Sequence, residues 1–76
     1  MNKGVNMTFG EEIKYVRKSL YLSQAEMGQK LNVTENTVRR WENSKSNPRD
    51  SAKRKFYALC KKEKIKIPDL INDNFL

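Results

Sequence analysis

The chain has 76 residues, a single cysteine and no histidine, which excludes an intramolecular disulfide and a zinc site built from cysteine and histidine. Sixteen lysines and arginines against nine aspartates and glutamates give a net charge of +7, which favours a polyanionic partner. No apolar run of about 18 residues and no apolar N-terminal stretch occurs, so we expect a cytoplasmic protein without a membrane segment or signal peptide.

Residues 1–7 lack hydrophobic periodicity, and we expect a flexible N-terminal arm, either a disordered tail or, through Lys3, a segment for the DNA minor groove. A helix over about 9–20 is predicted next, because Thr8 and Glu11 have the spacing of a capping box. Four apolar residues then recur at helical spacing: Phe9, Ile13, Val16 and Leu20. This helix therefore has one apolar face.

A second helix is predicted to begin at Gln24, after a Ser-x-x-Glu capping box. Met27 and Leu31 place two apolar side chains on one face, and the small Gly28 beside them allows close approach of another helix. Asn32 follows, and asparagine tolerates the left-handed backbone conformation that ends many helices. The chain is therefore expected to turn at this point.

A third helix is predicted after Thr34, which is a good N-cap. Val38 and Trp41, three residues apart, point inward from it. The remaining face is polar and rich in hydrogen-bonding groups: Glu35, Asn36, Thr37, Arg39, Arg40 and Asn43. A short turn thus joins the second and third predicted helices over residues 24–43. The third helix carries a face suited to the major groove of DNA.

These residues resemble the helix-turn-helix of the Xre family, which comprises regulators of the phage-repressor type, Cro and lambda repressor among them. The matching core positions are Met27, Gly28, Leu31, Val33, Val38 and Trp41. The end of that family's recognition helix resembles the segment from Thr37 to Pro48, TVRRWENSKSNP. The resemblance covers about residues 9–72 and implies a lambda-repressor-like DNA-binding domain. The family usually has Ala where Gly28 stands and Gly where Asn32 and Ser44 stand.

The resemblance also implies which residues read bases. In the major groove, arginine binds guanine bidentately, asparagine binds adenine bidentately, and glutamate accepts a hydrogen bond from the cytosine amino group. The residues best placed for base edges are Glu35, Asn36 and Arg40, and Arg39 reaches either a base or a phosphate.

Other positions are implied to contact the DNA backbone or to hold the fold. The phosphate contacts that the resemblance implies are Gln24, Thr37 and Asn43, and Lys45 in the polar loop is also expected to donate to a phosphate. Arg17 is expected to form a structural ion pair with Glu42. The alternatives are that Gln24 is an ordinary helix-start residue, that the loop residues are merely solvated, and that Arg17 and Glu42 are unrelated surface charges.

The rest of the chain is predicted to add two more helices. Residues 43–50 form a polar loop, and a helix over about 51–62 follows. Its apolar face comprises Ala52, Phe56, Leu59 and Cys60. The alternating residues 64–67 are interpreted as a loop leading into a short helix at Pro68. We therefore expect an all-α fold, a compact bundle of five helices with the helix-turn-helix at its centre, in one domain over residues 8–76.

Positive charge is concentrated in the second half of the chain. Residues 39–66 contain eleven basic and three acidic residues, whereas residues 1–38 contain five basic and four acidic ones. The excess begins in the third helix and continues after it. It either forms a solvated surface or attracts the DNA backbone at long range.

These patterns predict a small transcriptional regulator, expected to be a repressor, that binds a specific double-stranded DNA sequence in a bacterial or phage nucleoid. We expect a weak or DNA-induced homodimer, because one such domain contacts half of an operator. Phe75 and Leu76 either pack against the core or form an apolar dimer contact. The chain lacks the features of an enzyme, and no cofactor, metal or small-molecule site is evident.

Two other functions fit parts of the same pattern. The first is a protein-interaction module on this fold, such as an antitoxin or a polymerase-recruiting adaptor. The second is non-specific coating of nucleic acid by charge alone. Glu35 argues against coating, because a carboxylate on the binding surface repels phosphate.

Overall fold

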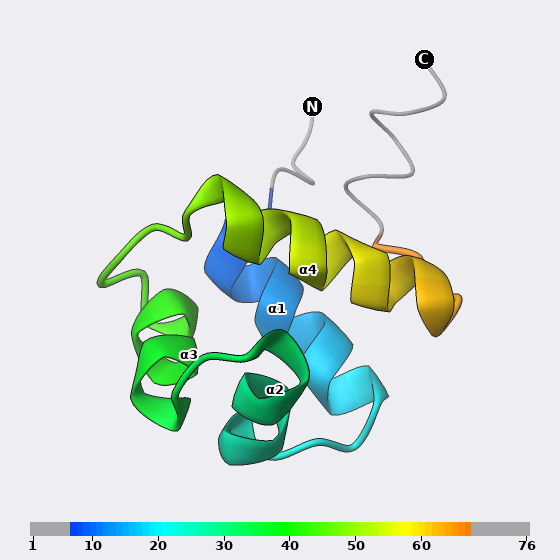
Figure 1. Ribbon diagram of the computed structural model, residues 1–76, viewed down its shortest axis with the longest axis horizontal. Coiled ribbons are helices and arrows are strands. Elements are labelled where there is room, and N and C mark those ends of the chain that lie inside the picture. Colours follow the sequence, from blue (N-terminus) through cyan, green and yellow to red (C-terminus); the bar gives the residue numbers. More distant parts are fainter. Residues whose placement is uncertain (1–6, 68–76) are drawn as a thin grey trace.

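The structure, a computed structural model, describes residues 7–67 and has an all-α fold. Four helices occur in this part of the chain: α1 (Phe9–Ser19), α2 (Gln24–Leu31), α3 (Glu35–Glu42) and α4 (Asp50–Lys62) (Figure 1). The all-α class and the helix-turn-helix, formed by α2 and α3, confirm the prediction. The predicted fifth helix at Pro68 lies outside the described residues, as do Lys3, Phe75 and Leu76.

Side chains cap the N-terminal ends of the first three helices. Thr8 Oγ1 accepts a hydrogen bond from the Glu11 backbone N–H at 3.1 Å, and Glu11 Oε1 accepts one from the Thr8 N–H at 2.8 Å. Ser23 and Glu26 repeat this arrangement at α2, and Thr34 caps α3. Both predicted capping boxes and the Thr34 cap are therefore confirmed.

Each helix ends next to a non-glycine residue with a left-handed backbone. The φ angles are 58° at Tyr21, 60° at Asn32, 58° at Ser44 and 57° at Lys64. Backbone hydrogen bonds close the last turn in every case, as where the Leu22 N–H donates to the Arg17 carbonyl at 3.0 Å. The prediction for Asn32 is confirmed, the family's usual Gly at the position of Ser44 is consistent with the left-handed backbone there, and no pattern in the sequence indicated Tyr21 or Lys64.

The core lies where the four helices meet. Its buried side chains come from every helix and from the segment after α4: Ile13, Val16, Met27, Leu31, Val38, Trp41, Phe56, Cys60 and Ile67. The Phe9 ring meets two of the core rings edge to face, with centroid distances of 5.4 Å to Trp41 and 5.1 Å to Phe56. Phe9 therefore joins α1 to both α3 and α4.

Two glycines lie where a side chain has no room. A Cβ atom on Gly10 in α1 would overlap the carbonyl oxygen of Trp41 in α3. A Cβ atom on Gly28 would lie 2.6 Å from the carbonyl oxygen of Val33. The close neighbours of Gly28 are the turn of its own motif and Thr34, the N-cap of α3, so the segment that approaches it is the start of the next helix. A second close approach, between α1 and α3, occurs at Gly10.

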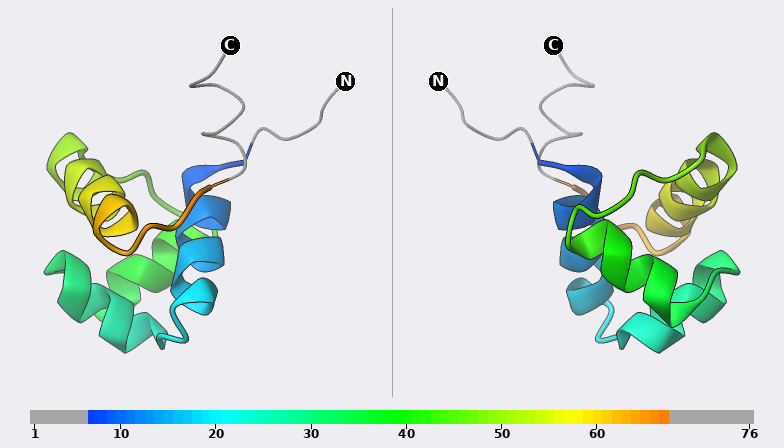
Figure 2. Two further views of the ribbon diagram at one scale, coloured as in Figure 1. Left: turned by 90° about the vertical axis from the view of Figure 1, so that its right-hand side faces the viewer. Right: turned by 90° about the vertical axis from the view of Figure 1, so that its left-hand side faces the viewer.

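The helices pack around the helix-turn-helix. α3 packs against α1 and α2, and α4 packs against α2. The connection over residues 43–49 spans the space between α3 and α4 (Figures 1 and 2). A hydrogen bond of 2.6 Å from Tyr57 Oη to Glu12 Oε1 also links α4 to α1. This arrangement covers one side of α3 and leaves the opposite side in solvent.

Candidate nucleic-acid interface

The outward side of α3 forms a surface that we call the reading face. Val38 is fully buried and Trp41 is 4% exposed, so these residues direct one side of α3 into the core. The helical repeat places five exposed side chains on the other side. The reading face comprises Glu35, Asn36, Arg39, Arg40 and Asn43. It presents guanidinium, amide and carboxylate groups, which are the groups that pair with base edges.

A hydrogen-bonded network joins the start of α2 to the end of α3. Arg17 Nε and Nη2 donate to the two carboxylate oxygens of Glu42 at 2.7 and 3.1 Å. Arg17 Nη1 donates to the Leu22 carbonyl at 3.0 Å, and Gln24 Nε2 donates to Glu42 Oε1 at 3.1 Å. The Arg17 and Glu42 side chains are 14% and 4% exposed, so water screens the pair little. The network fixes the N-terminal end of α2 relative to α3.

Two members of the reading face are bonded to each other. Arg39 Nη2 donates a hydrogen bond to Asn36 Oδ1, one helical turn away. Because a guanidinium group only donates, this bond holds the amide oxygen toward Arg39 and leaves the amide N–H groups for other acceptors. Bidentate pairing of Asn36 with adenine uses both ends of the amide. Such pairing therefore requires Arg39 to share or release the oxygen.

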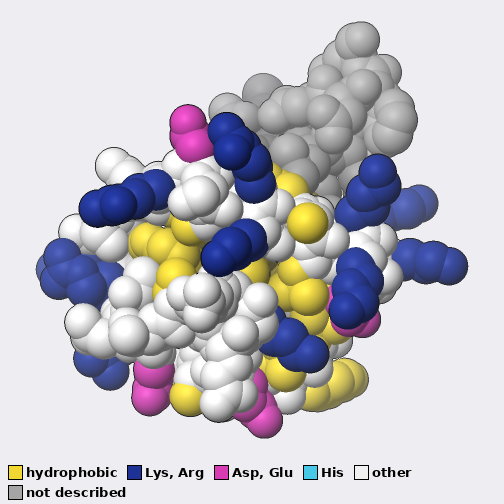
Figure 3. Space-filling model, in the orientation of Figure 1, with side chains coloured by type: hydrophobic (Ala, Val, Ile, Leu, Met, Phe, Trp, Pro, Cys, Tyr) yellow, Lys and Arg dark blue, Asp and Glu magenta, His cyan; other side chains and the backbone are white. Residues whose placement is uncertain are grey.

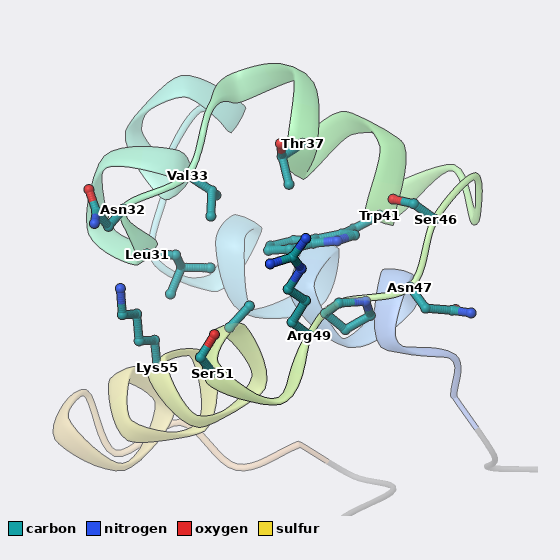
Figure 4. A pocket seen from close by; sticks show the side chains of 12 residues that line it. Leu31, Asn32, Val33, Thr37, Trp41, Ser46, Asn47, Arg49, Ser51 and Lys55 are labelled. Atoms are coloured by element: carbon teal, nitrogen blue, oxygen red, sulfur yellow. The ribbon is translucent and has the colours of Figure 1, made fainter.

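Thr37 is directed away from the reading face. Its hydroxyl oxygen lies 2.9 Å from Thr34 Oγ1, and its side chain is half-buried. Figure 4 shows Thr37 pointing from α3 into the space between α3 and α4. Gln24, Asn43 and Lys45 lie at the start of α2 or at the end of α3. Because Gln24 is hydrogen-bonded to Glu42, the residue before Asn43, the structure brings Gln24 close to the end of α3 and leaves Thr37 apart from it.

A comparison with protein families decides what kind of domain this is. The family model described as helix-turn-helix matches residues 13–52, which include α2, α3 and most of α1. The chain belongs to this helix-turn-helix family, whose members include the Xre and lambda-repressor-like proteins. It is a DNA-binding family, so double-stranded DNA is the partner that the match supports. No curated protein and no solved structure gives a significant match.

In this helix-turn-helix protein, two of the predicted phosphate contacts lie at the end of α3: Asn43, within the reading face, and Lys45, just beyond it. Asn43 is the C-cap of α3, and Lys45 follows it in the turn. The Lys45 backbone N–H donates to the Arg40 carbonyl at 2.8 Å, which holds the turn against the helix. The side chains of Asn43 and Lys45 are both exposed. They are therefore available to a DNA backbone that follows α3.

On the face of the helix-turn-helix protein drawn in Figure 3, the cationic side chains are not gathered into one cluster. Figure 3 shows Lys and Arg distributed across one face of the molecule, with Asp and Glu between them. Such a distribution attracts a polyanion over distances of about 10 Å at moderate salt but does not define a single binding site.

The sequence interpretation missed a buried carboxylate. Glu12 is 5% exposed and accepts the hydrogen bond from Tyr57 Oη. The signal was present, because Glu12 lies three residues after Phe9 and four before Val16 and so falls on the apolar stripe of α1. Burial, and secondarily the Glu12 charge, raises the pKa of the Cys60 thiol to about 11. This cysteine is therefore protonated at neutral pH and is a packing residue.

Three further features concern the described part of the chain. Between residues 7 and 67 no helix is long and apolar enough to cross a membrane. In the same range, no group of three or more His, Cys, Asp or Glu side chains is arranged to hold a metal ion. A cavity lies between α3 and α4, with Arg49 and Lys55 among its lining residues. No sequence pattern indicated this cavity, because it depends on the spacing between two helices.

Proposed function

We propose that this protein binds a specific double-stranded DNA sequence by placing α3 in the major groove, and that it acts as a small transcriptional repressor in a bacterial or phage nucleoid. The observation that supports the proposal best is the division of α3 into a buried side and an exposed reading face. The major groove of B-DNA is about 12 Å wide and admits an α-helix. The reading face then meets the base edges.

Base recognition is assigned to four residues of the reading face. Arg40 donates bidentately to guanine, and Glu35 accepts from a cytosine amino group. Asn36 pairs with adenine once Arg39 shares or releases its oxygen, and Arg39 then contacts a base or a phosphate. Glu35 supports readout of sequence over charge-driven coating, because a carboxylate at the interface weakens attraction to phosphate.

Backbone contacts are assigned to residues at the two ends of the α2–α3 unit. Gln24 is held by Glu42 at the start of α2, where free N–H groups and the helix dipole favour a phosphate. Asn43 and Lys45 contact a phosphate beyond the end of α3. Thr37 joins this set only when its hydroxyl leaves Thr34. These contacts position α3 without reading sequence.

The proposed operator contains two half-sites. One recognition helix reads only a few base pairs, so regulators of this kind commonly bind as pairs to inverted repeats with centres about 10 bp apart. We assign a homodimer that is weak in solution or forms on DNA.

In vitro selection from a random duplex library at near-physiological salt tests the proposal. We expect a defined inverted-repeat consensus. An Arg40→Ala variant should select a consensus that is relaxed at one position of each half-site. Recovery of DNA without any consensus would limit the function to backbone binding. No recovery would favour the alternative function, a protein-interaction module such as an antitoxin or a polymerase-recruiting adaptor.

A further inference from the structure

The cavity between α3 and α4 has a volume of about 330 Å³ and opens to solvent (Figure 4). Its walls come from α2, from α3, from the connection over residues 43–49 and from the first turns of α4. The apolar part of the lining consists of Leu31, Val33, Trp41, Pro48 and Ala52. The volume lies at the lower end of the range for ligand pockets, about 300 to 1,000 Å³. The cavity is thus large enough for a small organic molecule.

Two cations accompany the apolar lining. Figure 4 shows Arg49, at the end of the connection before α4, and Lys55 of α4 directed into the space that the cavity occupies. Both residues are exposed, and within residues 7–67 neither side chain forms an ion pair. None of the residues that line the cavity is acidic. The local charge is therefore positive beside an apolar wall, and it favours a ligand that carries a negative charge.

We infer that this cavity binds a small organic anion with an aromatic or aliphatic body, such as an aryl-substituted carboxylate. The apolar body lies against the partly exposed side chains of Val33, Pro48 and Ala52, where it is removed from water, with the buried Trp41 and Leu31 behind them. The carboxylate lies toward Arg49 and Lys55, whose N–H groups donate charge-assisted hydrogen bonds. A free inorganic phosphate fits less well, because it leaves the apolar wall hydrated.

The single tryptophan of the chain reports binding directly. Trp41 lines the cavity, so a ligand there shifts the indole N–H resonance and the tryptophan fluorescence. Three probes test the negative charge and the aromatic body of the ligand separately. They are phenylacetate, its uncharged analogue phenylacetamide, and acetate, which lacks the aromatic body. The full chain is titrated without DNA. We expect saturable shifts at Trp41, Thr37 and Ser51 with phenylacetate, binding about fivefold weaker with phenylacetamide, and no saturation with acetate.

Matched variants locate the site. Replacing both cavity cations, Arg49→Gln with Lys55→Gln, should weaken phenylacetate about fivefold or more and abolish its preference over phenylacetamide. Lys53→Gln is the control, because Lys53 lies on the same helix but lines a different, shallow hollow. It should bind phenylacetate as the wild type does. Ala52→Leu, which adds volume to the cavity wall, should prevent binding while thermal unfolding shows that the fold is intact.

Three results would overturn the inference. They are the absence of saturable shifts up to the solubility limit of phenylacetate, equal binding of phenylacetate and phenylacetamide, and equal effects of Lys53→Gln and the double substitution. These measurements contain no DNA, so their failure leaves the proposed sequence-specific binding untouched. Likewise, a failure of in vitro selection would not contradict the proposed ligand site.

Discussion

Arg17 of α1 and Glu42 of α3 are joined by two hydrogen bonds of 2.7 and 3.1 Å, and Gln24 and the Leu22 carbonyl complete the set around them. The guanidinium and the carboxylate therefore have most of their hydrogen-bonding capacity used inside the protein. Removing one partner leaves the other charge buried and unpaired, which costs more than the pair itself contributes.

The first prediction is that Arg17→Ala lowers the free energy of unfolding by about 3 kcal/mol. Urea unfolding at neutral pH, followed by Trp41 fluorescence, measures the change. Replacing both partners by apolar residues, Arg17→Met with Glu42→Leu, should cost clearly less, because no buried charge remains. Arg54→Ala, at an exposed position of α4, is the control and should change stability by less than about 0.5 kcal/mol. A similarly small loss for Arg17→Ala would show that water solvates the pair.

The second prediction concerns the contact between α1 and α3. Gly10→Ala should destabilise the fold by about 2 kcal/mol, although alanine favours a helix by about 1 kcal/mol over glycine. The new methyl group would overlap the Trp41 carbonyl oxygen, a backbone atom that moves only if the two helices separate. Thermal unfolding followed by circular dichroism measures the loss. Lys14→Ala, exposed on the same helix, should leave the midpoint nearly unchanged. A stabilising Gly10→Ala would contradict the close approach.

The third prediction is that Tyr21→Gly raises the free energy of unfolding by about 1 kcal/mol. Tyr21 has a φ of 58° and is 94% exposed, so glycine relieves backbone strain and little packing is lost. Lys18→Gly, three residues earlier inside α1, should lower stability by about 1 kcal/mol. Both substitutions raise the conformational entropy of the unfolded chain by the same amount. Stability changes of opposite sign would therefore come from the native backbone conformation at the two positions. Two losses of equal size would refute the strain argument.

The fourth prediction follows from the burial of Cys60. Burial, with a smaller effect from the Glu12 charge, raises the pKa of this thiol from 9.0 to about 11. Between these values the unfolded chain has lost the thiol proton while the folded protein retains it. The Cys60 contribution to stability is therefore fully present below pH 9.0 and is lost as the pH rises toward about 11.

Urea unfolding across this pH range tests the fourth prediction by comparing the wild type with Cys60→Ala. The substitution lowers stability at every pH because it leaves a cavity. The informative quantity is therefore the slope of the free energy of unfolding against pH. We expect a shallower decline with pH in the variant. Parallel declines would show that Cys60 does not contribute to the pH dependence of stability. A thiol-alkylating reagent should also react slowly with the native protein.

The fifth prediction separates base contacts from backbone contacts on DNA. Arg40→Ala should cost about 1 to 3 kcal/mol on the best site and much less on random DNA. Lys45→Ala should weaken binding to both DNAs equally and reduce the dependence of log affinity on log salt by about one unit. Fluorescence anisotropy at several salt concentrations measures both. An equal loss on the two DNAs for Arg40→Ala would remove Arg40 from base recognition.

Local sequence signals account for the frame of this fold. The Ser-x-x-Glu and Thr-x-x-Glu capping boxes fix where α2 and α1 begin, and the inward pair Val38 and Trp41 fixes which side of α3 faces the core. Each of these features depends on residues a few positions apart. A single chain therefore carries enough information to place them.

Features that depend on distant segments were not predictable in this way. The overlap at Gly10 arises because Trp41 is brought against it from 31 positions away. The bond between Asn36 and Arg39 depends on side-chain rotamers, and the cavity beside Lys55 depends on how far α4 lies from α3. Tyr21 and Lys64 have a left-handed backbone, although their residue types do not favour that conformation. The type of residue therefore gave no sign of it.

The two sides of α3 have a consequence for altering this protein. Asn36 and Arg40 are exposed and take no part in the core, whereas Val38 and Trp41 are buried and lie away from the reading face. Exchanging the exposed residues should therefore redirect the protein to new DNA sequences with little loss of thermal stability. The scaffold can in this way tolerate a combinatorial library on one helix, and a failed variant in such a library would reflect poor recognition, not misfolding.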